Sequence, residues 1–378
     1  MKILALNAGS SSLKASLFEL TRSDTDRSRP HGLLWEAERA DSQHSLVELL
    51  APLWSGREAM LSSPSEIDAV GHRVVHGGSD LQESAPVTSE VLAEIARAAE
   101  YAPSHNAGAL GAMASATALF GADVPQVAVF DTAFHRTLPP AAFTYAGPYA
   151  WLEQGIRRFG FHGVNHEYVS QRARELLNAH DTDLRVVSCH LGSGCSLAAI
   201  RNGESVDTTM GFTPLDGLPM ARRSGAIDPG ILLHLLRLGG ATVDSLDDLL
   251  NHDSGLAGLS GTSGDMRTVL VAVDAGNDRA RLALDVFVHH VRQGIAAMAA
   301  SMGGVNALVF TGGIGEHSPR VRAEICASLG FLGVVLDEKL NAGVVDDADI
   351  ADGRSRTRVL VIVAQENWMI ARECLRLL

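Results

Sequence analysis

The chain has 378 residues, of which 46% are hydrophobic and 20% charged, and this predicts a globular protein of about two domains. Its formal net charge of −13 argues against non-specific nucleic-acid binding, which requires a basic surface. No stretch approaches the roughly 20 apolar residues of a membrane helix, and the N-terminus shows no signal-peptide pattern. The four cysteines form no C-x-x-C pair. We therefore expect a cytoplasmic protein with reduced thiols and no zinc ribbon or thioredoxin motif.

The first half of the chain alternates between expected strands and helices. Apolar runs bounded by glycine-rich turns predict strands at 2–7, 13–20, 66–76 and 125–130. Apolar residues at helical spacing predict a helix from Ser89, and a run of small residues predicts another over 107–119. The polar segment 21–45 is expected to form an exposed loop or a loose sheet edge.

The second half repeats this order. Strands are expected at 185–191, 195–201, 307–310 and 358–363, and helices at 166–179, 278–302 and from about Glu366. Asp228-Pro229 and Ser318-Pro319 each place a capping residue before a proline, which predicts two further helix starts. Such alternation indicates an α/β protein with mixed sheets covered by helices.

Two segments about half the chain apart resemble each other. Residues 3–14 (ILALNAGSSSLK) and 186–197 (VVSCHLGSGCSL) both run from an apolar strand through a polar and a small residue to glycine. A Gly/Ser-rich turn into a second strand follows in both. This pattern predicts a duplicated domain with a phosphate-facing hairpin in each copy, the alternative being a chance likeness of two turns.

Gly/Ser turns suit phosphate because backbone N–H groups can converge on a polyanion where no Cβ intervenes. Lys14 follows the first turn and could supply a point charge. Gly312-Gly313-Ile314-Gly315 lies between an expected strand and a capped helix, where backbone could meet a nucleotide. The chain has no Walker A motif and no early G-x-G-x-x-G fingerprint, which argues against a P-loop NTPase and a dinucleotide dehydrogenase.

Eight segments resemble acetate kinases in order and spacing, across nearly the whole chain. They are LNAGSSSLK (6–14), GHRVVHGG (71–78), FDTAFH (130–135), FGFHG (159–163), HLGSGCS (190–196), MGFTPLDGLPMARRSG (210–225), SGDMR (263–267) and FTGGIGEHS (310–318). The resemblance to this acetate and propionate kinase family, in the actin, hexokinase and Hsp70 superfamily, implies two duplicated actin-like, ribonuclease H-like domains. Their mixed sheets would be flanked by helices, with an interdomain cleft.

The same resemblance implies the domain bounds, the assembly and the reaction. An N-terminal domain would cover 1–148 and be joined by the C-terminal helix at about 367–378. A nucleotide-binding and dimerisation domain would cover 149–366 of a homodimer. The implied reaction is acetate + ATP ⇌ acetyl phosphate + ADP, with Mg²⁺, or Mn²⁺ in its place, as the metal. Propionate or butyrate is the alternative acceptor.

Residue roles carry over from the family motif by motif. Arg73, Asp131, His162 and Arg223 would be catalytic, and the carboxylate would lie among Arg73, Val75, Ser104, Pro214 and Arg223. Metal ligands would be Asn7, Asp131 and Glu366. Nucleotide and phosphates would contact Asn7, Ser10, Ser12, Lys14, His190, Gly192, Ser193, Gly194, Asp265, Met266, Arg267, Gly312, Gly313, Ile314 and Gly315.

The chemistry explains why arginines are needed. A carboxylate is already a nucleophile at neutral pH, so the difficulty is the repulsion between two anions and their alignment. Guanidinium forks bind such oxyanions in a bidentate way, and we expect direct in-line transfer. The alternatives are a phosphoenzyme on His162, a non-catalytic ATP-gated protein of the actin or Hsp70 type, and a pyrophosphate-dependent kinase. His162 and His166 could instead form a metal pair, although the sequence shows no third ligand.

Four positions depart from the family pattern. Ser193 stands where asparagine is usual, Ser104 where leucine is usual, Arg222 where a small residue is usual, and Asn367 in place of a second glutamate. The loss of apolar wall at Ser104 would shift the preference among short acids, because each buried methylene contributes about 0.8 kcal/mol.

Overall fold

The computed structural model describes residues 1–8, 13–39, 46–57, 59–100, 103–179 and 183–378, without the side chains of 103–105. It separates into two compact units. Unit 1 comprises Met1–Arg136, Phe161–Tyr168 and Gln365–Leu378, and unit 2 comprises Thr137–Gly160 and Val169–Ala364. Each unit is built on one six-stranded mixed sheet, so the expected α/β class is confirmed.

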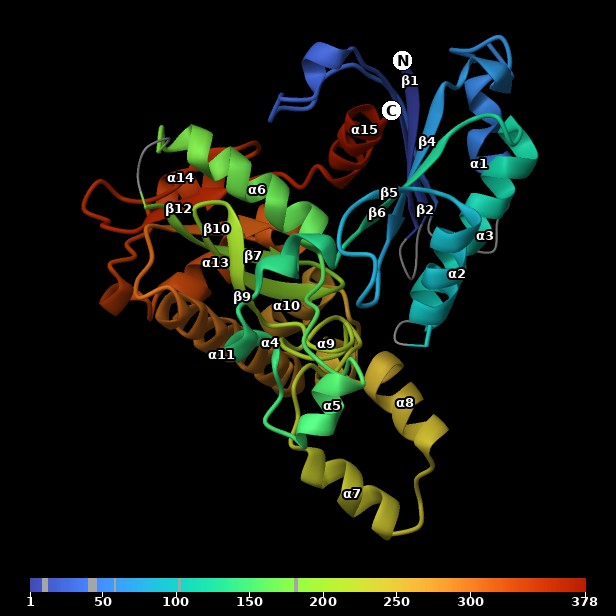
Figure 1. Ribbon diagram of the computed structural model, residues 1–378. Helices are drawn as coiled ribbons and strands as arrows, with labels where there is room; N and C mark the ends of the chain where they lie inside the picture. Colours follow the sequence, from blue (N-terminus) through green and yellow to red (C-terminus); the bar gives the residue numbers. More distant parts are fainter. Residues whose placement is uncertain (9–12, 40–45, 58, 101–102, 180–182) are drawn as a thin grey trace. The chain divides into compact units, whose positions relative to one another are not determined.

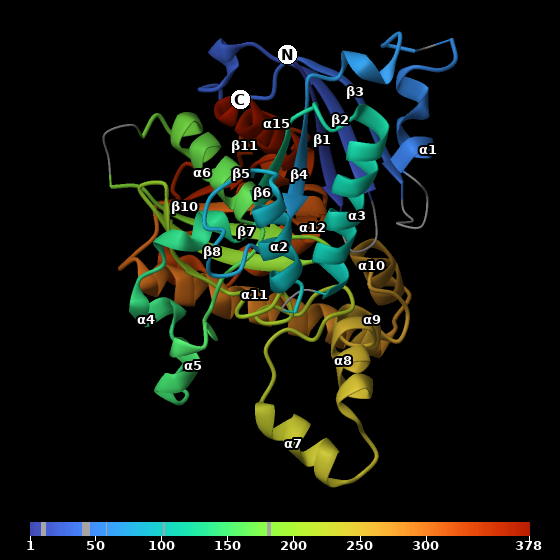
Figure 2. The same cartoon turned by 45° about the vertical axis from the view of Figure 1, so that its right-hand side comes forward.

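Unit 1 has the strand order β3-β2-β1-β4-β6-β5 (Figure 1). Its strands are β1 (Lys2–Ala8), β2 (Leu13–Glu19), β3 (Leu33–Arg39), β4 (Ala69–Val74), β5 (Ala85–Pro86) and β6 (Gln126–Phe130). Its helices are α1 (Leu46–Leu50), α2 (Ser89–Ala98), α3 (Pro103–Phe120) and α15 (Glu366–Leu377). Helix α15 contacts β1, β4 and β6, and α3 contacts β4 and β1. Figures 1 and 2 show these two helices on opposite faces of the sheet.

Unit 2 has the order β11-β12-β10-β7-β8-β9. Its strands are β7 (Arg185–Leu191), β8 (Cys195–Arg201), β9 (Glu204–Thr208), β10 (Ala307–Thr311), β11 (Ala348–Asp349) and β12 (Arg358–Val361). Its helices are α4 (Pro140–Phe143), α5 (Tyr149–Glu153), α7 (Pro229–Arg237), α8 (Val243–His252), α9 (Gly255–Ser260), α10 (Met266–Asp274), α11 (Asp278–Ser301), α12 (Gly312–His317), α13 (Pro319–Cys326) and α14 (Glu338–Gly343). Helix α6 (Gly163–Leu176) begins in unit 1 and ends in unit 2.

The two sheets share one topology. In unit 1, β1 pairs antiparallel with β2 and parallel with β4, and β6 pairs parallel with β4 and antiparallel with β5. In unit 2, β7, β8, β10, β12 and β11 stand in the same relations. The outer strands β3 and β9 are antiparallel to β2 and β8. The duplication expected from the two similar segments is therefore confirmed.

The central strands of each sheet are apolar because they are buried. Residues of β1, β4, β7 and β10 are almost all buried, as expected for strands covered on both faces. Gly71 in β4 is required by this packing, because a Cβ there would lie 2.5 Å from Cys374 Sγ on α15. No helix in the described ranges has the length and apolar character that crossing a membrane requires.

Candidate active site

In unit 1, polar side chains gather where three parallel strands end. Asn7 lies near the end of β1, Arg73 near the end of β4, and Asp131 directly after β6. These strands are neighbours and run parallel, so their carboxyl ends meet at one edge of the sheet, where ligands of open α/β sheets bind. Glu366 joins them as the first residue of α15.

Arg73 is the centre of this cluster. Its Nε lies 2.8 Å from Asp131 Oδ1 and its Nη2 lies 2.6 Å from Asp131 Oδ2, which makes a bidentate pair. Nη1 donates to Asn7 Oδ1 at 3.0 Å and lies 3.5 Å from Glu366 Oε2. The Nδ2 of Asn7 donates to the same Glu366 oxygen at 2.7 Å. One guanidinium thus holds both carboxylates that the family resemblance assigns to the metal.

Burial sets the electrostatics of the pair. Burial lowers the pKa of Arg73, but the negative charges of Asp131 and Glu366 together have a larger, opposite effect. The pKa of Arg73 is therefore raised above its usual value. Burial also raises the pKa of Asp131, and Arg73 opposes that shift. Because two N–H groups of a charged guanidinium donate to both oxygens of Asp131, its carboxylate is ionised at neutral pH.

His162 lies beside Asp131 through the backbone. The Gly163 N–H donates to the Asp131 carbonyl oxygen at 2.9 Å, and a Cβ on Gly163 would lie 2.1 Å from that oxygen. His162 itself is buried and has a φ of 56°, a left-handed conformation that residues other than glycine rarely adopt. Strain of this kind concentrates at functional sites. Helix α6 starts three residues earlier than expected because the chain turns at His162.

Lys14 and Val75 are the other predicted residues of unit 1 whose side chains the structure describes. Lys14 on β2 stands opposite Asn7 in the strand register, so both side chains face the same side of the sheet, and Lys14 Nζ lies 3.4 Å from Glu38 Oε2. Val75 is buried directly after β4. Ser10 and Ser12 lie outside the described residues, as does the side chain of Ser104 in α3.

In unit 2, a pocket of about 830 Å³ brings together seven predicted nucleotide residues. They are Gly192, Ser193, Asp265, Met266, Arg267, Gly313 and Ile314. Its size falls in the usual range for small-molecule sites. The hairpin between β7 and β8 and the start of α12 are in contact here, since a Cβ on Gly192 would lie 3.8 Å from the Gly313 nitrogen.

Four further predicted residues of unit 2 do not line this pocket. Gly312 and Gly315 are buried and do not line the pocket. Gly194 accepts from the Gly192 N–H at 3.0 Å and so closes the hairpin turn, and His190 lies near the end of β7. Asp265 both lines the pocket and caps α10, accepting from the Arg267 N–H at 2.8 Å.

Arg223 is hydrogen-bonded within unit 2 to Pro214, which was predicted to contact the acceptor carboxylate. Its Nη1 donates to the carbonyl oxygen of buried Pro214 at 2.8 Å. The adjacent Arg222 lines the pocket of unit 2 and donates from Nε to the His252 carbonyl oxygen at 2.5 Å, at the end of α8. Arg73 and Pro214 belong to different units.

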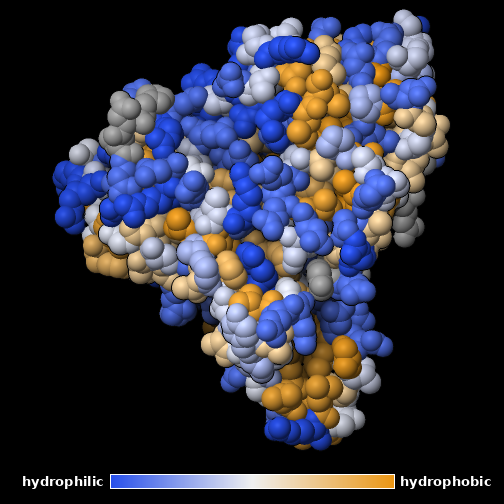
Figure 3. Space-filling model, in the orientation of Figure 1, coloured by the Kyte–Doolittle hydropathy of each residue, from blue (hydrophilic) through white to orange (hydrophobic). Residues whose placement is uncertain are grey.

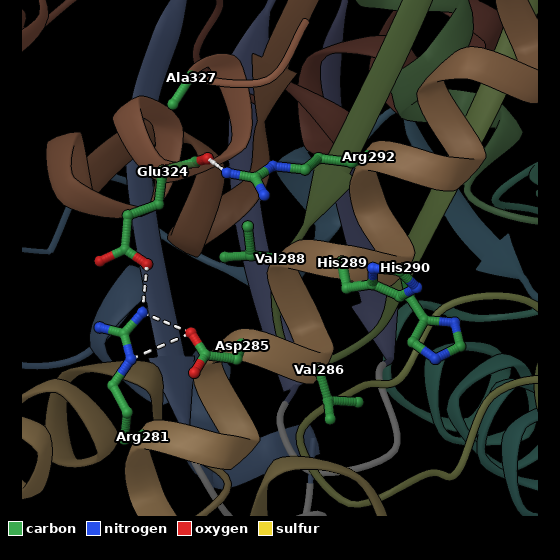
Figure 4. Close-up of a pocket in the computed structure, with 9 residues that line it drawn as sticks. All are labelled: Arg281, Asp285, Val286, Val288, His289, His290, Arg292, Glu324 and Ala327. Carbon is green, nitrogen blue, oxygen red and sulfur yellow. Dashed lines mark hydrogen bonds and ion pairs between the residues drawn. The ribbon is translucent and has the colours of Figure 1, made fainter.

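A second hollow, on α11 and α13 of unit 2, has a different character (Figure 4). Its Arg281 is bound to both Asp285 and Glu324, and Arg292 donates to the carbonyl oxygens of Glu324 and Ile325. The residues that line this hollow lie outside the eight segments quoted from the sequence.

The chain matches a family model described as the Acetokinase family over residues 2–372. The chain belongs to the acetokinase family. The acetate kinase of Gloeobacter violaceus is 50% identical over 400 residues, covering 99% of this chain and 98% of its own length. That of a Cyanothece species is 48% identical over 405 residues, covering 100% and 98%.

Solved structures agree with this membership of the acetokinase family. The Porphyromonas gingivalis acetate kinase structure has a TM-score of 0.86 at 37% identity and covers 98% of each chain. A propionate kinase from Francisella tularensis has a TM-score of 0.88 at 34% identity and covers 100% of each chain. The expected family resemblance is thereby confirmed over the whole chain.

Three of the four positions expected to depart from the family pattern, Ser193, Arg222 and Asn367, have defined places in the structure. Ser193 lies exposed on the unit 2 pocket. Asn367 donates from Nδ2 to Ser16 Oγ on β2 at 2.7 Å, so it ties α15 to the sheet. The pocket is also lined by residues that the sequence did not assign to a binding site, although several stand within the quoted motifs. These are Ala221, Ser263, Gly264, Leu270, His317, Ser318, Pro319 and Arg320.

The unit 1 cluster has the donor chemistry that magnesium requires. Mg²⁺ takes hard oxygen ligands, keeps several waters, and is usually held by one or two carboxylates. The carboxylates of Asp131 and Glu366 both contact the Arg73 guanidinium, and Asn7 adds an amide group beside Glu366. Among the described residues, no group of three His, Cys, Asp or Glu side chains is arranged to hold a metal by itself. These residues would therefore fit a Mg²⁺ as oxygen ligands, with water or phosphate as the others.

Proposed function

We propose that the chain is a carboxylate kinase that forms acetyl phosphate and ADP from acetate and ATP in the cytoplasm. The observation that carries the proposal is Arg73, whose guanidinium is held at the strand ends by Asp131, Asn7 and Glu366. This cluster, the unit 2 pocket lined by Gly313 and Ile314 and membership of the acetokinase family together support a phosphoryl transferase with a small anionic acceptor.

In the mechanism we propose, Arg73 and Arg223 hold the acceptor carboxylate and the equatorial oxygens of the transferring phosphoryl group. Fixed cations reduce the repulsion between the two anions without reorganisation during the reaction. Mg²⁺ held by Asp131, Glu366 and Asn7 would neutralise charge on the nucleotide phosphates. His162 donates a hydrogen bond to a developing oxyanion, and its strained backbone (φ 56°) supports a fixed orientation.

The reaction needs no base, because the acceptor is ionised far above its pKa at pH 7. Direct in-line transfer is therefore the proposed course. Nucleotide phosphates would contact Lys14 in unit 1 and the hairpin at Gly192 in unit 2, and the glycines there leave space for close backbone approach.

The test is trapping of the product. Purified protein is incubated with ATP, Mg²⁺, hydroxylamine and acetate, propionate or butyrate, and acyl hydroxamate is measured. We expect acetyl hydroxamate, with the Arg223→Ala protein, purified in the same way, as the control for contaminating kinases. Absence of hydroxamate with every acid would refute the proposed function.

Propionate is the second candidate acceptor. Ser104 removes apolar wall relative to the family's leucine, and the Francisella tularensis protein that the fold matches is a propionate kinase. A larger pocket gains about 0.8 kcal/mol for each methylene it buries, which corresponds to roughly fourfold in kcat/KM. A higher kcat/KM for propionate than for acetate in the same assay would favour this candidate.

We also propose a homodimer, supported by the surface of unit 2. Helix α7 has the sequence PGILLHLLR and none of its residues is buried within the chain. Ile231, Leu233 and Leu236 are exposed, and Figure 3 shows the apolar surface gathered at α7. Contiguous exposed apolar surface of this kind marks protein interfaces, and a second copy of the chain would cover it.

Replacing Leu233 and Leu236 together with glutamate should convert the dimer to a monomer, because like charges would be buried in the interface. Light scattering after gel filtration should then give a mass near the 40.0 kDa of one chain. Val345→Glu is the control, since Val345 is 93% exposed and lies outside α7. A wild-type mass of one chain would rule out the homodimer.

A further inference from the structure

Glu316 has an unusual position at the nucleotide pocket. It lies in α12, whose first turn (Gly312–Gly315, here called the nucleotide turn) carries Gly313 and Ile314, and its side chain is only 9% exposed. A single oxygen, Oε1, accepts from two backbone N–H groups, that of Gly312 at 2.7 Å and that of Ala364 at 2.9 Å. Hydrogen bonds to a charged acceptor are stronger than those between neutral groups.

The first of these bonds fixes the entry to the nucleotide turn. Gly312 has a φ of 76°, which a residue with a Cβ rarely adopts. A Cβ there would also lie 2.9 Å from the Leu191 carbonyl oxygen. The backbone thus turns sharply against β7 before it reaches Gly313 and Ile314, and Glu316 binds the N–H at that turn.

The second bond lies where the chain leaves unit 2. After β12, Ile362 N–H donates to the Phe310 carbonyl oxygen and Val363 N–H donates to Asp347 Oδ1, both at 3.0 Å. Ala364 N–H then donates to Glu316, and Ala364 is the last residue of unit 2. Two residues later comes Glu366, which binds Asn7 and lies near Arg73 in unit 1.

Helix α12 is held firmly from its other end. Arg322 is buried and donates from Nη1 to the carbonyl oxygens of Gly315 and Glu316, at 2.8 and 2.7 Å. Its Nε and Nη2 donate to the Oδ1 and carbonyl oxygen of Asn341, both at 2.7 Å. Because α12 cannot shift easily, the Glu316 carboxylate has a fixed position relative to the nucleotide turn.

We propose that Glu316 is a positioning residue that links the nucleotide turn to the chain segment leading into Glu366. Through one oxygen it fixes both Gly312 and Ala364, so nucleotide binding and the placement of the Glu366 carboxylate depend on the same group. Contiguous hydrogen-bond networks of this kind carry coupling between sites. The inference rests on the proposed function for the role of Glu366, and on the pocket alone for nucleotide binding.

The test compares Glu316→Ala, Glu316→Gln and a matched control, Asp337→Ala. Asp337 Oδ1 also accepts from two backbone N–H groups, those of Lys339 and Leu340, at the start of α14 in the same unit. Calorimetry gives the Kd for ADP with Mg²⁺, and the hydroxamate assay gives kcat and the KM values for ATP and acetate. Thermal unfolding monitors the fold of each variant.

For Glu316→Ala we expect the ADP Kd and ATP KM to rise about tenfold and kcat to fall at least tenfold, with the acetate KM within twofold. Glu316→Gln should recover most of this loss, because its amide oxygen can accept both N–H groups. Asp337→Ala should lower the melting temperature and leave the ADP Kd within twofold.

Two results would overturn the proposal. One is an unchanged ADP Kd in a folded Glu316→Ala protein, and the other is an equal rise in Kd in Asp337→Ala, which would show general destabilisation. ADP binding does not depend on the acceptor acid. A wild type that binds ADP but phosphorylates no acid would therefore refute the proposed function and not the role of Glu316 at the nucleotide turn.

Discussion

The Arg73→Ala enzyme should lose at least about 10³-fold in kcat for acetyl phosphate formation, the magnitude typical of arginines that stabilise a transferring phosphoryl group. Arg73 is the guanidinium that Asp131 and Asn7 aim at the strand ends of unit 1. Loss of the charge removes stabilisation that the transition state needs most, so kcat should fall more than the affinity for ATP. The hydroxamate assay gives kcat and the KM for ATP.

Stability must be separated from catalysis in this experiment. Asp131 is 1% exposed, and removal of one partner of a buried ion pair costs about 3–5 kcal/mol. Arg73→Lys keeps the charge and loses the fork, so it should remain folded in a urea titration and still lose about 100-fold in kcat. Arg136→Ala is the control, because Arg136 forms an exposed pair with Glu83. Wild-type kcat in Arg73→Lys would contradict the proposed role.

The second large effect is expected at Arg223 in unit 2. Arg223→Ala should also lower kcat by about 10³-fold, and Arg223→Lys should recover little of it because an ammonium cannot replace a bidentate fork. Arg201→Ala serves as the control in the same unit, since Arg201 forms an exposed pair with Asp183. If kcat survives in Arg223→Ala and only the ATP KM rises, Arg223 contacts the nucleotide and not the reacting phosphoryl group.

A double-mutant cycle tests whether Arg73 and Arg223 act on one group. If both hold the same phosphoryl oxygens, the loss in the double lysine variant should be smaller than the product of the two single losses. Independent arginines would give the full product. The cycle therefore tests for convergence of the two guanidinium groups without reference to a bound ligand.

Much of the secondary structure followed from local pattern. The strands at 185–191 and 195–201 match β7 and β8, and the expected helix at 278–302 matches α11 to within one residue. The polar segment 21–45 was less clear because it contains the edge strand β3, whose residues are mostly exposed. Edge strands carry charged residues that prevent further pairing, and this makes them resemble loops in a sequence.

The sequence alone indicated the duplicated domain, because segments 3–14 and 186–197 resemble each other. The structure has the same strand order in both sheets. It also identified the motifs of the acetokinase family. Only the tertiary structure showed that the Arg73 guanidinium binds Asp131, Asn7 and Glu366. It also showed that Glu316 accepts a hydrogen bond from the Ala364 N–H. Local patterns reflect backbone preferences over a few residues, whereas these contacts join strand ends and loops far apart in the chain. They form because neighbouring parallel strands end at one edge of a sheet.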